Sequence, residues 1–191
     1  MAPATTTDDP AKRERLRQII KQLSFRNDRT FTLASGRTSN IFFDLKPTML
    51  DAEGIDLIAD LLLAKIKRID AGYLGGLAMG AVPVVVAAVL KSRATPRPLR
   101  GFWVRKEQKD HGAAKRADGH LVDGSRVIIA EDVTTTGGSA MTAIAEVRQH
   151  HCEIAAVVTI VDRLEGAREN LAREGIDLIA LFDRNDFVRA E

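Results

Sequence analysis

The sequence has only one cysteine, Cys152, and no long hydrophobic run. One cysteine cannot form an intramolecular disulfide, and there is no cysteine cluster that could bind zinc or an iron–sulfur centre. The longest apolar run, residues 81–90, is far shorter than the roughly 20 residues that span a bilayer. The first residues also lack the apolar region of a signal peptide. We therefore expect a soluble protein of the reducing cytoplasm, with no membrane partner.

An excess of one charge sign is also missing. The 28 basic and 26 acidic side chains leave a formal net charge of +2, and both signs are interspersed along the chain. This balance excludes a general nucleic-acid binder, because such proteins need a strongly basic surface. With 45% apolar residues among 191, the chain can build one ordinary globular domain and is too short for two comfortable ones.

The apolar spacing predicts strands that alternate with helices. Pro10 is well placed to begin a helix, and Asp51 is placed to cap another. Short β-favouring runs flank a turn at residues 35–37. A short strand to about Leu77 precedes a helix with Pro83 in its first turn. The remaining expected elements are strands 101–106, 126–131, 155–161 and 176–182, helices 139–150 and about 164–173, and a polar loop at 107–124. This order predicts an α/β fold whose central, mainly parallel sheet has helices on both faces.

One stretch, VIIAEDVTTTGGSA at residues 127–140, passes from apolar residues to two carboxylates and then to hydroxyls and glycines. Ligands of an open α/β sheet collect at the carboxyl ends of the strands, where Glu131 and Asp132 are expected. Small residues that lead into a helix offer a phosphate their backbone amides and the positive end of the helix dipole. A sugar phosphate fits both halves. Its vicinal hydroxyls donate to the two acids, while its phosphate lies on the amides of residues 134–139.

The same stretch also fits an acidic cap on an ordinary helix. It does not fit a nucleotide P-loop, because no glycine is followed by Lys-Ser or Lys-Thr at the required spacing, and it is not a G-x-G-x-x-G turn. The ordered combination of acids, threonines and glycines is more specific than a cap. The sugar-phosphate site is therefore the favoured interpretation.

VIIAEDVTTTGGS resembles the phosphoribosyl-pyrophosphate (PRPP) motif of the type I phosphoribosyltransferases. FTLASGRTSNIFFD, RKEQKDHG and VDR resemble segments of the orotate phosphoribosyltransferase family, in that family's order and over roughly residues 30–165. The resemblance implies transfer of ribose 5-phosphate from PRPP to orotate, which gives orotidine 5′-monophosphate and pyrophosphate on the way to UMP. It also implies the type I phosphoribosyltransferase fold in one domain 1–191, with an N-terminal hood of helix and strands at about 1–50, a core at about 51–183 and a flexible catalytic loop at 107–124.

The resemblance assigns PRPP binding to the acids and the loop after them, with Asp132 also catalytic. These residues are Glu131, Asp132, Val133, Thr134, Thr135, Thr136, Gly137, Gly138 and Ser139. Cationic donors for the departing pyrophosphate are expected at Arg105, Lys106, Lys109 and His111. Lys109 is implied as the catalytic lysine, in a loop that closes against water and reaches a neighbouring subunit's site, so a homodimer with shared active sites is expected. The alternative for this stretch is a solvated charged loop.

Orotate is flat and carries a carboxylate, so its pocket needs an aromatic or apolar wall and a cationic fork. From the matching family positions, Phe42 and Phe43 are expected to form the wall and Arg163 to pair with the carboxylate. Thr135 corresponds to a threonine that contacts the base. Without the family match, Phe42 would be a core residue and Arg163 a surface turn residue.

Two positions depart from the family pattern. Thr38 and Met79 stand where many relatives carry lysines that help to hold PRPP. Each charged contact is worth roughly 1.5 to 3 kcal/mol, so losing both without compensation would weaken binding on the order of a hundredfold or more. We hypothesise that Arg37 or Lys46 replaces some of the missing charge, because both lie near these strand ends.

Some polar residues are expected to have no chemical role. His150 and His151 close a helix, where an imidazolium suits the negative end of the dipole, and neither has an acidic or cysteine partner at metal spacing. Cys152 is expected to be a small core side chain. The expected cofactor is Mg²⁺, held mainly by pyrophosphate oxygens and ribose hydroxyls rather than by protein ligands.

Two rival functions stay open. The first is the same fold acting on another base, such as a purine, which has no carboxylate to pair with Arg163. The second is a non-catalytic regulator that senses PRPP and binds nucleic acid. Against it, the residues before Phe31 hold one helix, which is too little for a helix-turn-helix. No nucleic-acid partner is therefore expected.

Overall fold

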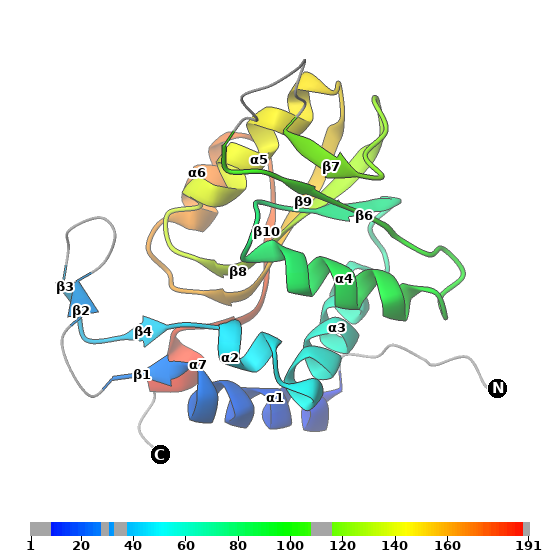
Figure 1. Ribbon diagram of the computed structural model, residues 1–191. Coiled ribbons are helices and arrows are strands. Elements are labelled where there is room, and N and C mark those ends of the chain that lie inside the picture. Colours follow the sequence, from blue (N-terminus) through cyan, green and yellow to red (C-terminus); the bar gives the residue numbers. More distant parts are fainter. Residues whose placement is uncertain (1–8, 28–30, 33–37, 108–115, 189–191) are drawn as a thin grey trace.

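A six-stranded sheet forms the centre of the computed structural model, which describes residues 9–27, 31–32, 38–107 and 116–188 (Figure 1). The strand order is β10-β9-β8-β5-β6-β7, and neighbouring strands are parallel except for β6 and β7. The strands span Tyr73–Gly75 (β5), Arg100–Val104 (β6), Ala117–Gly119 (β7), Arg126–Thr134 (β8), Glu153–Asp162 (β9) and Leu178–Asp183 (β10). The predicted mainly parallel α/β sheet is confirmed.

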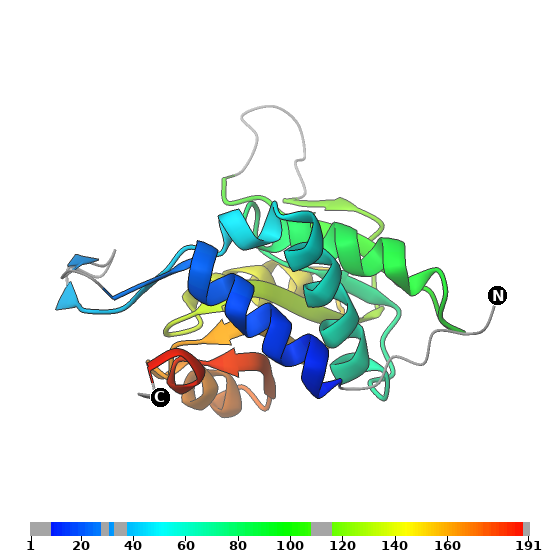
Figure 2. The ribbon, with the colours of Figure 1, turned by 90° about the horizontal axis from the view of Figure 1, so that it is seen from below.

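Helices cover both faces of this sheet (Figure 1). They span Pro10–Leu23 (α1), Lys46–Met49 (α2), Ala52–Ile66 (α3), Ala81–Ser92 (α4), Gly138–Gln149 (α5), Ala167–Arg173 (α6) and Asn185–Val188 (α7). Side chains of α1, α3 and α4 share one apolar core, and those of α5 and α6 share a second. α1 lies against α3 on the outside of the first layer (Figure 2). Within the described ranges, none of these helices has the length and apolar character needed to cross a membrane.

β8 lies between β5 and β9 and carries the acidic pair. Its residues 127–130 are buried. They are all apolar, as expected for a strand that is covered on both faces. The prediction ended this strand at residue 131, whereas the structure continues it to Thr134, which is paired with Asp162 of β9. The prediction failed because β9 supplies hydrogen-bond partners beyond the apolar run. The acids therefore lie inside a paired strand.

Two helices begin at the capping residues that the sequence provides. The carboxylate of Asp9 accepts the N–H of Ala11 at 2.9 Å, and α1 starts at Pro10. The carboxylate of Asp51 accepts the N–H of Gly54 at 2.8 Å at the start of α3. Such caps satisfy N–H groups that the helix itself leaves unpaired. Both helices start as predicted.

The N-terminal segment forms two small antiparallel ladders. β2 (Phe31–Thr32) pairs with β3 (Thr38–Ser39), as predicted for the strands beside residues 35–37, which themselves lie outside the described part. β1 (Phe25–Arg26) pairs with β4 (Phe42–Phe43), and the sequence did not predict this ladder. The β2–β3 ladder projects from the body of the protein in both views (Figure 1, Figure 2). The β1–β4 ladder instead packs Phe25 and Phe43 into the core that contains α3.

The prediction of a loop without regular structure at residues 107–124 is wrong for part of that stretch. β7 pairs with β6, so that Ala117 faces Val104 and Gly119 faces Phe102. An edge strand of this length satisfies backbone groups of its neighbour and needs no apolar periodicity, so the residue pattern gives no sign of it. Residues 108–115 lie outside the described part of the chain.

The segment between β9 and α6 is a turn, not the start of a helix. The helix predicted from about residue 164 begins at Ala167. Leu164 and Gly166 have positive φ angles of 56° and 102°, whereas residues of a right-handed helix have negative φ angles. A leucine with positive φ is uncommon, so the sequence pattern did not indicate this turn.

Candidate active site

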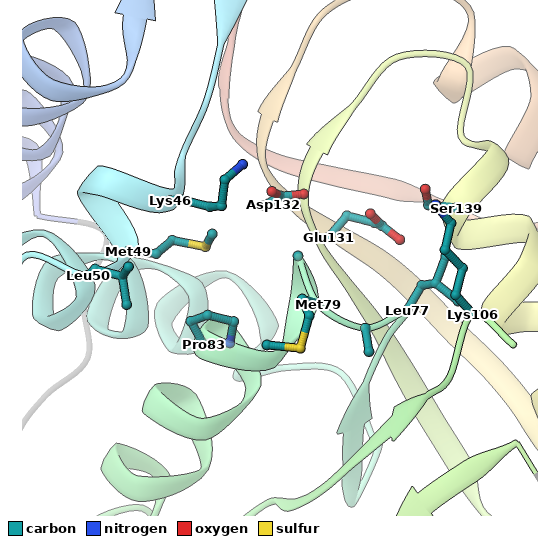
Figure 3. Close-up of a pocket in the computed structure, with 12 residues that line it drawn as sticks. Lys46, Met49, Leu50, Leu77, Met79, Pro83, Lys106, Glu131, Asp132 and Ser139 are labelled. Atoms are coloured by element: carbon teal, nitrogen blue, oxygen red, sulfur yellow. The ribbon is translucent and has the colours of Figure 1, made fainter. Parts of the chain in front are cut away.

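A pocket of about 440 Å³ opens beyond the carboxyl ends of β5, β6 and β8. Figure 3 shows Glu131 and Asp132 near its centre, Lys46 on one side, and Lys106 and Ser139 on the other. Its lining residues are Lys46, Met49, Leu50, Leu77, Ala78, Met79, Gly80, Pro83, Lys106, Glu131, Asp132 and Ser139. The pocket lies at the edge of the sheet where α/β proteins bind their ligands.

The two carboxylates of β8 are both shifted towards their protonated forms. Glu131 is 5% exposed, and burial together with the neighbouring charge of Asp132 raises its pKa to about 8. Burial also raises the pKa of Asp132, although the N–H of Val133, 2.8 Å from its Oδ1, and the ammonium of Lys46 oppose this shift. Among the described residues, Oε1 of Glu131 has no hydrogen-bond partner. A buried acceptor is costly to leave unpaired, so this site favours a ligand that brings hydroxyl donors.

Gly80 is a site residue that the sequence analysis did not single out. It lies in the turn between β5 and α4, and a Cβ at this position would stand 2.8 Å from Oδ1 of Asp132. Any side chain at position 80 would therefore displace the carboxylate or the turn. The only signal in the sequence is the density of glycines between residues 75 and 80.

The loop from β8 to α5 is fixed by the segment that precedes α6. The carbonyls of residues 134–135 accept the backbone N–H groups of Arg163 and Ala167 at 2.9 and 3.1 Å. Gly137, with φ of 84°, turns the chain into α5. The first turn of that helix leaves N–H groups and the positive end of the dipole at this loop, and it places Ser139 in the pocket. The expected phosphate-binding loop is therefore next to the acid pair.

Two of the four predicted cationic donors lie in the described part of the chain. Lys106 follows β6 and lines the pocket. Nε of Arg105 lies 3.1 Å from Oδ2 of Asp118 on β7. Lys109 and His111 lie outside the described residues, so their predicted roles stay predictions.

Lys46 brings a further cation to the pocket. It begins α2, and its Nζ lies 2.6 Å from Oδ1 of Asp44. The hydrogen bond to Asp44 is the main reason that the pKa of Lys46 is raised, and the charge of Asp132 adds to the shift. This position agrees with the hypothesis that Lys46 compensates for a missing lysine.

The two departures from the family pattern lie in different places. Met79 is 75% exposed and lines the pocket, so an uncharged side chain occupies this part of the wall. Thr38 belongs to β3, in the ladder that projects from the body. Arg37, the other candidate for compensation, lies outside the described residues.

Arg163 and the predicted aromatic wall come together although they are far apart in the sequence. Nη2 of Arg163 donates to the carbonyl of Ile41 at 3.3 Å, across 122 positions, and Phe42 is the next residue. Arg163 is 5% exposed, and its Nη2 also lies 2.8 Å from Oε1 of Glu165. The guanidinium is therefore already held by a carboxylate before any orotate binds.

Phe42 and Phe43 are not equivalent. Phe43 is buried, and its ring centroid lies 5.1 Å from that of Phe25 and 5.2 Å from that of Phe187. This corrects the prediction for Phe43, because a ring enclosed by other rings offers no face to a ligand. Phe42 is partly exposed and stays the candidate for the wall, with Thr135 as the candidate base contact.

His150 closes α5 as expected but does have acidic neighbours. Its Nδ1 lies 2.8 Å from Oδ1 of Asp123, and its Nε2 lies 4.0 Å from Oε1 of Glu146. The separation of 27 residues from Asp123 hid the first contact from the sequence analysis. Cys152 is a buried core residue, as predicted. In the ranges that the structure describes, no group of three or more His, Cys, Asp or Glu residues is arranged to hold a metal ion.

Comparison with known proteins identifies the family. Residues 55–183 match the model of the phosphoribosyl transferase domain. The orotate phosphoribosyltransferase of Bradyrhizobium diazoefficiens is 44% identical over 184 residues, which are 94% of this chain and 98% of that protein. The orotate phosphoribosyltransferase of Aquifex aeolicus is 38% identical over 179 residues, which are 93% of this chain and 98% of that protein. This chain belongs to the orotate phosphoribosyltransferase family.

Solved structures agree with membership of the orotate phosphoribosyltransferase family. The Mycobacterium tuberculosis orotate phosphoribosyltransferase in complex with Fe(III) dicitrate gives a TM-score of 0.81 at 34% identity and covers 93% of this chain and 99% of that chain. The same enzyme in complex with PRPP gives 0.77 at 33% identity, over 92% and 98%. The adenine phosphoribosyltransferase of Leishmania tarentolae, 18% identical with a TM-score of 0.63 over 91% and 89%, shares the fold alone. The predicted family and the predicted type I phosphoribosyltransferase fold are confirmed.

Proposed function

We propose that the protein transfers ribose 5-phosphate from PRPP to orotate and releases orotidine 5′-monophosphate and pyrophosphate. The observation that carries this proposal is the acid pair inside β8, followed at once by the loop that begins α5, in a pocket with a lysine on either side. These parts offer acceptors to ribose hydroxyls, amides to a 5′-phosphate and cations to pyrophosphate. Family membership supports orotate as the base.

The reaction we infer is electrostatic and positional. The bond from C1 to pyrophosphate breaks with its electron pair on the leaving oxygen, a base nitrogen forms the new bond to C1, and the proton of that nitrogen is released. Glu131 and Asp132 hold the ribose hydroxyls and face the positive charge that develops on the sugar. Lys106 meets the negative charge on pyrophosphate, and the family resemblance adds Arg105, Lys109 and His111. No covalent intermediate with the enzyme is needed.

Mg²⁺ fits the donors that this pocket offers. The acids Glu131 and Asp132 are assigned to ribose hydroxyls, and the unpartnered Oε1 of Glu131 can accept one of them. A magnesium ion would then be held mainly by pyrophosphate oxygens and ribose hydroxyls, as hard oxygen ligands suit it. When bound, it would supply positive charge that stabilises the departing pyrophosphate.

We assign the base to Arg163 and Phe42, although neither is among the described residues that line the pocket. Orotate's carboxylate would bind Arg163 beside Glu165, because the five N–H groups of a guanidinium can serve both acceptors. Phe42 would cover one face of the ring. Thr135, whose carbonyl is fixed by Ala167, would contact the base from the phosphate loop.

A second copy of this chain is the partner we propose, in a cytoplasmic homodimer with shared active sites. Val86 and Leu90, one turn apart on α4, are 57% and 71% exposed. Leu50 and Met79, at 80% and 75%, bring exposed apolar surface to the rim of the pocket itself. Large exposed apolar side chains gathered in this way mark interfaces. An interface here would border the pocket, as sharing of active sites requires.

The proposal is tested by the fall in orotate absorbance when purified protein meets orotate, PRPP and Mg²⁺, with adenine, hypoxanthine and uracil in parallel. We expect turnover of orotate alone, and its loss in Lys109→Ala. Turnover of another base would keep the PRPP site but remove the role of Arg163. Absence of turnover with every base would favour a PRPP-sensing regulator.

A further inference from the structure

The side chain of Arg116, just before β7, is hydrogen-bonded to the segment just after β6. Arg116 donates from Nε and Nη2 to the carbonyl of Arg105 at 3.1 and 2.9 Å, and from Nη2 to the carbonyl of Lys106 at 2.9 Å. The backbone N–H of Arg105 donates to the carbonyl of Arg116 at 2.8 Å. The planar guanidinium thus fixes the two peptide groups that flank the Cα atom of Lys106.

Glu146 of α5 in turn fixes Arg116. Its Oε1 accepts the backbone N–H of Arg116 at 3.0 Å, and the residue is 5% exposed. A carboxylate is seldom this buried without a specific partner, and a hydrogen bond to a charged acceptor is stronger than a neutral one. Nε2 of His150 lies 4.0 Å from the same oxygen, while Asp123 holds the other ring nitrogen. The carboxylate of Glu146 is therefore itself held in a defined position.

These contacts connect the segment of Lys106 to the helix that follows the phosphate loop. The first turn of α5 carries Ser139, and Glu146 follows about two turns later on the same helix. Lys106 and Ser139 both line the pocket (Figure 3). We propose that Arg116 and Glu146 are positioning residues that hold Lys106 at a set place relative to the phosphate loop, so that its ammonium meets pyrophosphate.

The expected result of Arg116→Ala is a selective loss of pyrophosphate recognition. Its side-chain hydrogen bonds to two carbonyls disappear, while the charge of Lys106 stays. We expect the KM for PRPP and the Kd for pyrophosphate with Mg²⁺ to rise roughly tenfold. The KM for orotate at saturating PRPP should change less than about twofold. Steady-state kinetics with each substrate varied, and calorimetric titration of pyrophosphate, measure these values.

Two variants of Glu146 distinguish a positioning role from an effect on folding. Glu146→Gln keeps an oxygen that can accept the N–H of Arg116, so its KM for PRPP should stay within about threefold of the wild type. Glu146→Ala leaves that N–H unpaired and should reproduce the PRPP-selective change of Arg116→Ala. A purely structural role would not produce this difference between the two substrates.

The matched control is Arg126→Ala, at the opposite end of the sheet. Arg126 also donates to a backbone carbonyl, that of Asp70 at 3.1 Å, and pairs with Glu153 at 3.0 Å. Its loss removes a side-chain hydrogen bond to a backbone carbonyl away from the pocket and should leave the KM for PRPP unchanged.

Two outcomes would overturn the proposed role of Arg116 and Glu146. One is an equal change in both Michaelis constants in Arg116→Ala, and the other is an unchanged pyrophosphate Kd. The role rests on the proposed function for the identity of the anion. If wild-type protein binds no pyrophosphate with Mg²⁺, the PRPP site itself fails and this role fails with it. Binding by the wild type that is equal in the variant overturns the positioning role alone.

Discussion

The acidic and the cationic groups of the pocket belong to different kinds of secondary-structure element. Glu131 and Asp132 belong to β8, which lies within the sheet and stays paired with β9 beyond both residues. Lys46 begins the short helix α2, and Lys106 follows β6, next to the edge strand β7. The groups that we propose to hold the sugar are therefore on a strand that is paired on both sides. The groups that we propose to meet pyrophosphate are on elements with fewer backbone bonds.

The same difference appears in burial. The side chain of Lys46 is 72% exposed, whereas Glu131 is 5% exposed. Burial strengthens an electrostatic contact with a ligand, because water screens it less. It also disfavours the charged form in the empty site, which is the main reason that the pKa of Glu131 is raised to about 8. We therefore expect substitutions of the two acids to have larger effects than substitutions of the lysines.

The largest effect is expected for Asp132→Asn. The amide keeps the shape and can still accept the N–H of Val133, but the negative charge is lost. Two charge-assisted hydrogen bonds to ribose hydroxyls are worth roughly 1.5 to 3 kcal/mol each, so kcat/KM for PRPP should fall on the order of a thousandfold. Steady-state kinetics check this, with Asp70→Asn, at the far end of the sheet, as the control. A fall of less than about tenfold would mean that Asp132 does not hold the ribose.

The next effect is on stability and concerns Glu131. Its pKa is about 8 in the folded protein against 4.5 for the ordinary group, so between these values the folded protein keeps a proton that the unfolded chain has lost. The stability that this group contributes is fully present below pH 4.5 and is lost as the pH rises through 8. The slope is at most about 1.4 kcal/mol per pH unit.

Glu131→Gln removes this slope. The free energy of unfolding of the variant, measured with urea at pH 5 to 9, should exceed that of the wild type by an amount that grows up to about pH 8 and then levels. Glu169→Gln, at an exposed position on α6, is the control and should leave the slope unchanged. Parallel curves for the wild type and Glu131→Gln would show that the carboxyl is already ionised in the folded protein.

The acid pair and the loop after it could be predicted from sequence, because the signals for them lie in one short stretch. The apolar run, the two acids and the Thr/Gly loop are contiguous, so residues 127–140 specify strand, ligand groups and helix start together. The alternation of strands and helices likewise gave the sheet and its covering layers. Within residues 127–140, the exact end of β8 was missed, because it depends on the length of β9.

Other parts of the fold and of the candidate site could not be predicted to the same degree, because their contacts join residues that are far apart in the sequence. The ladder of β1 with β4 joins two-residue strands, and β7, which pairs with β6, has three residues, so these short strands carry no periodicity. The contact of Arg163 with Ile41 crosses 122 positions. The burial of Phe43 depends on Phe187, which comes from the other end of the chain. Patterns within a short window contain none of this information.

The smallest effect is expected for Lys46→Ala, and it tests how the site manages without the two family lysines. Lys46 lines the pocket opposite Lys106 but is exposed and paired with Asp44, so solvent and Asp44 weaken its attraction for an anion. We expect the KM for PRPP to rise roughly three- to tenfold with little change in kcat. Lys12→Ala removes another lysine that is paired with an aspartate, Asp60 on α3, and should leave the KM unchanged. An unchanged KM for PRPP in both Lys46→Ala and Arg37→Ala would remove these residues as replacements, and the binding of PRPP would then depend on Lys106 and the acid pair.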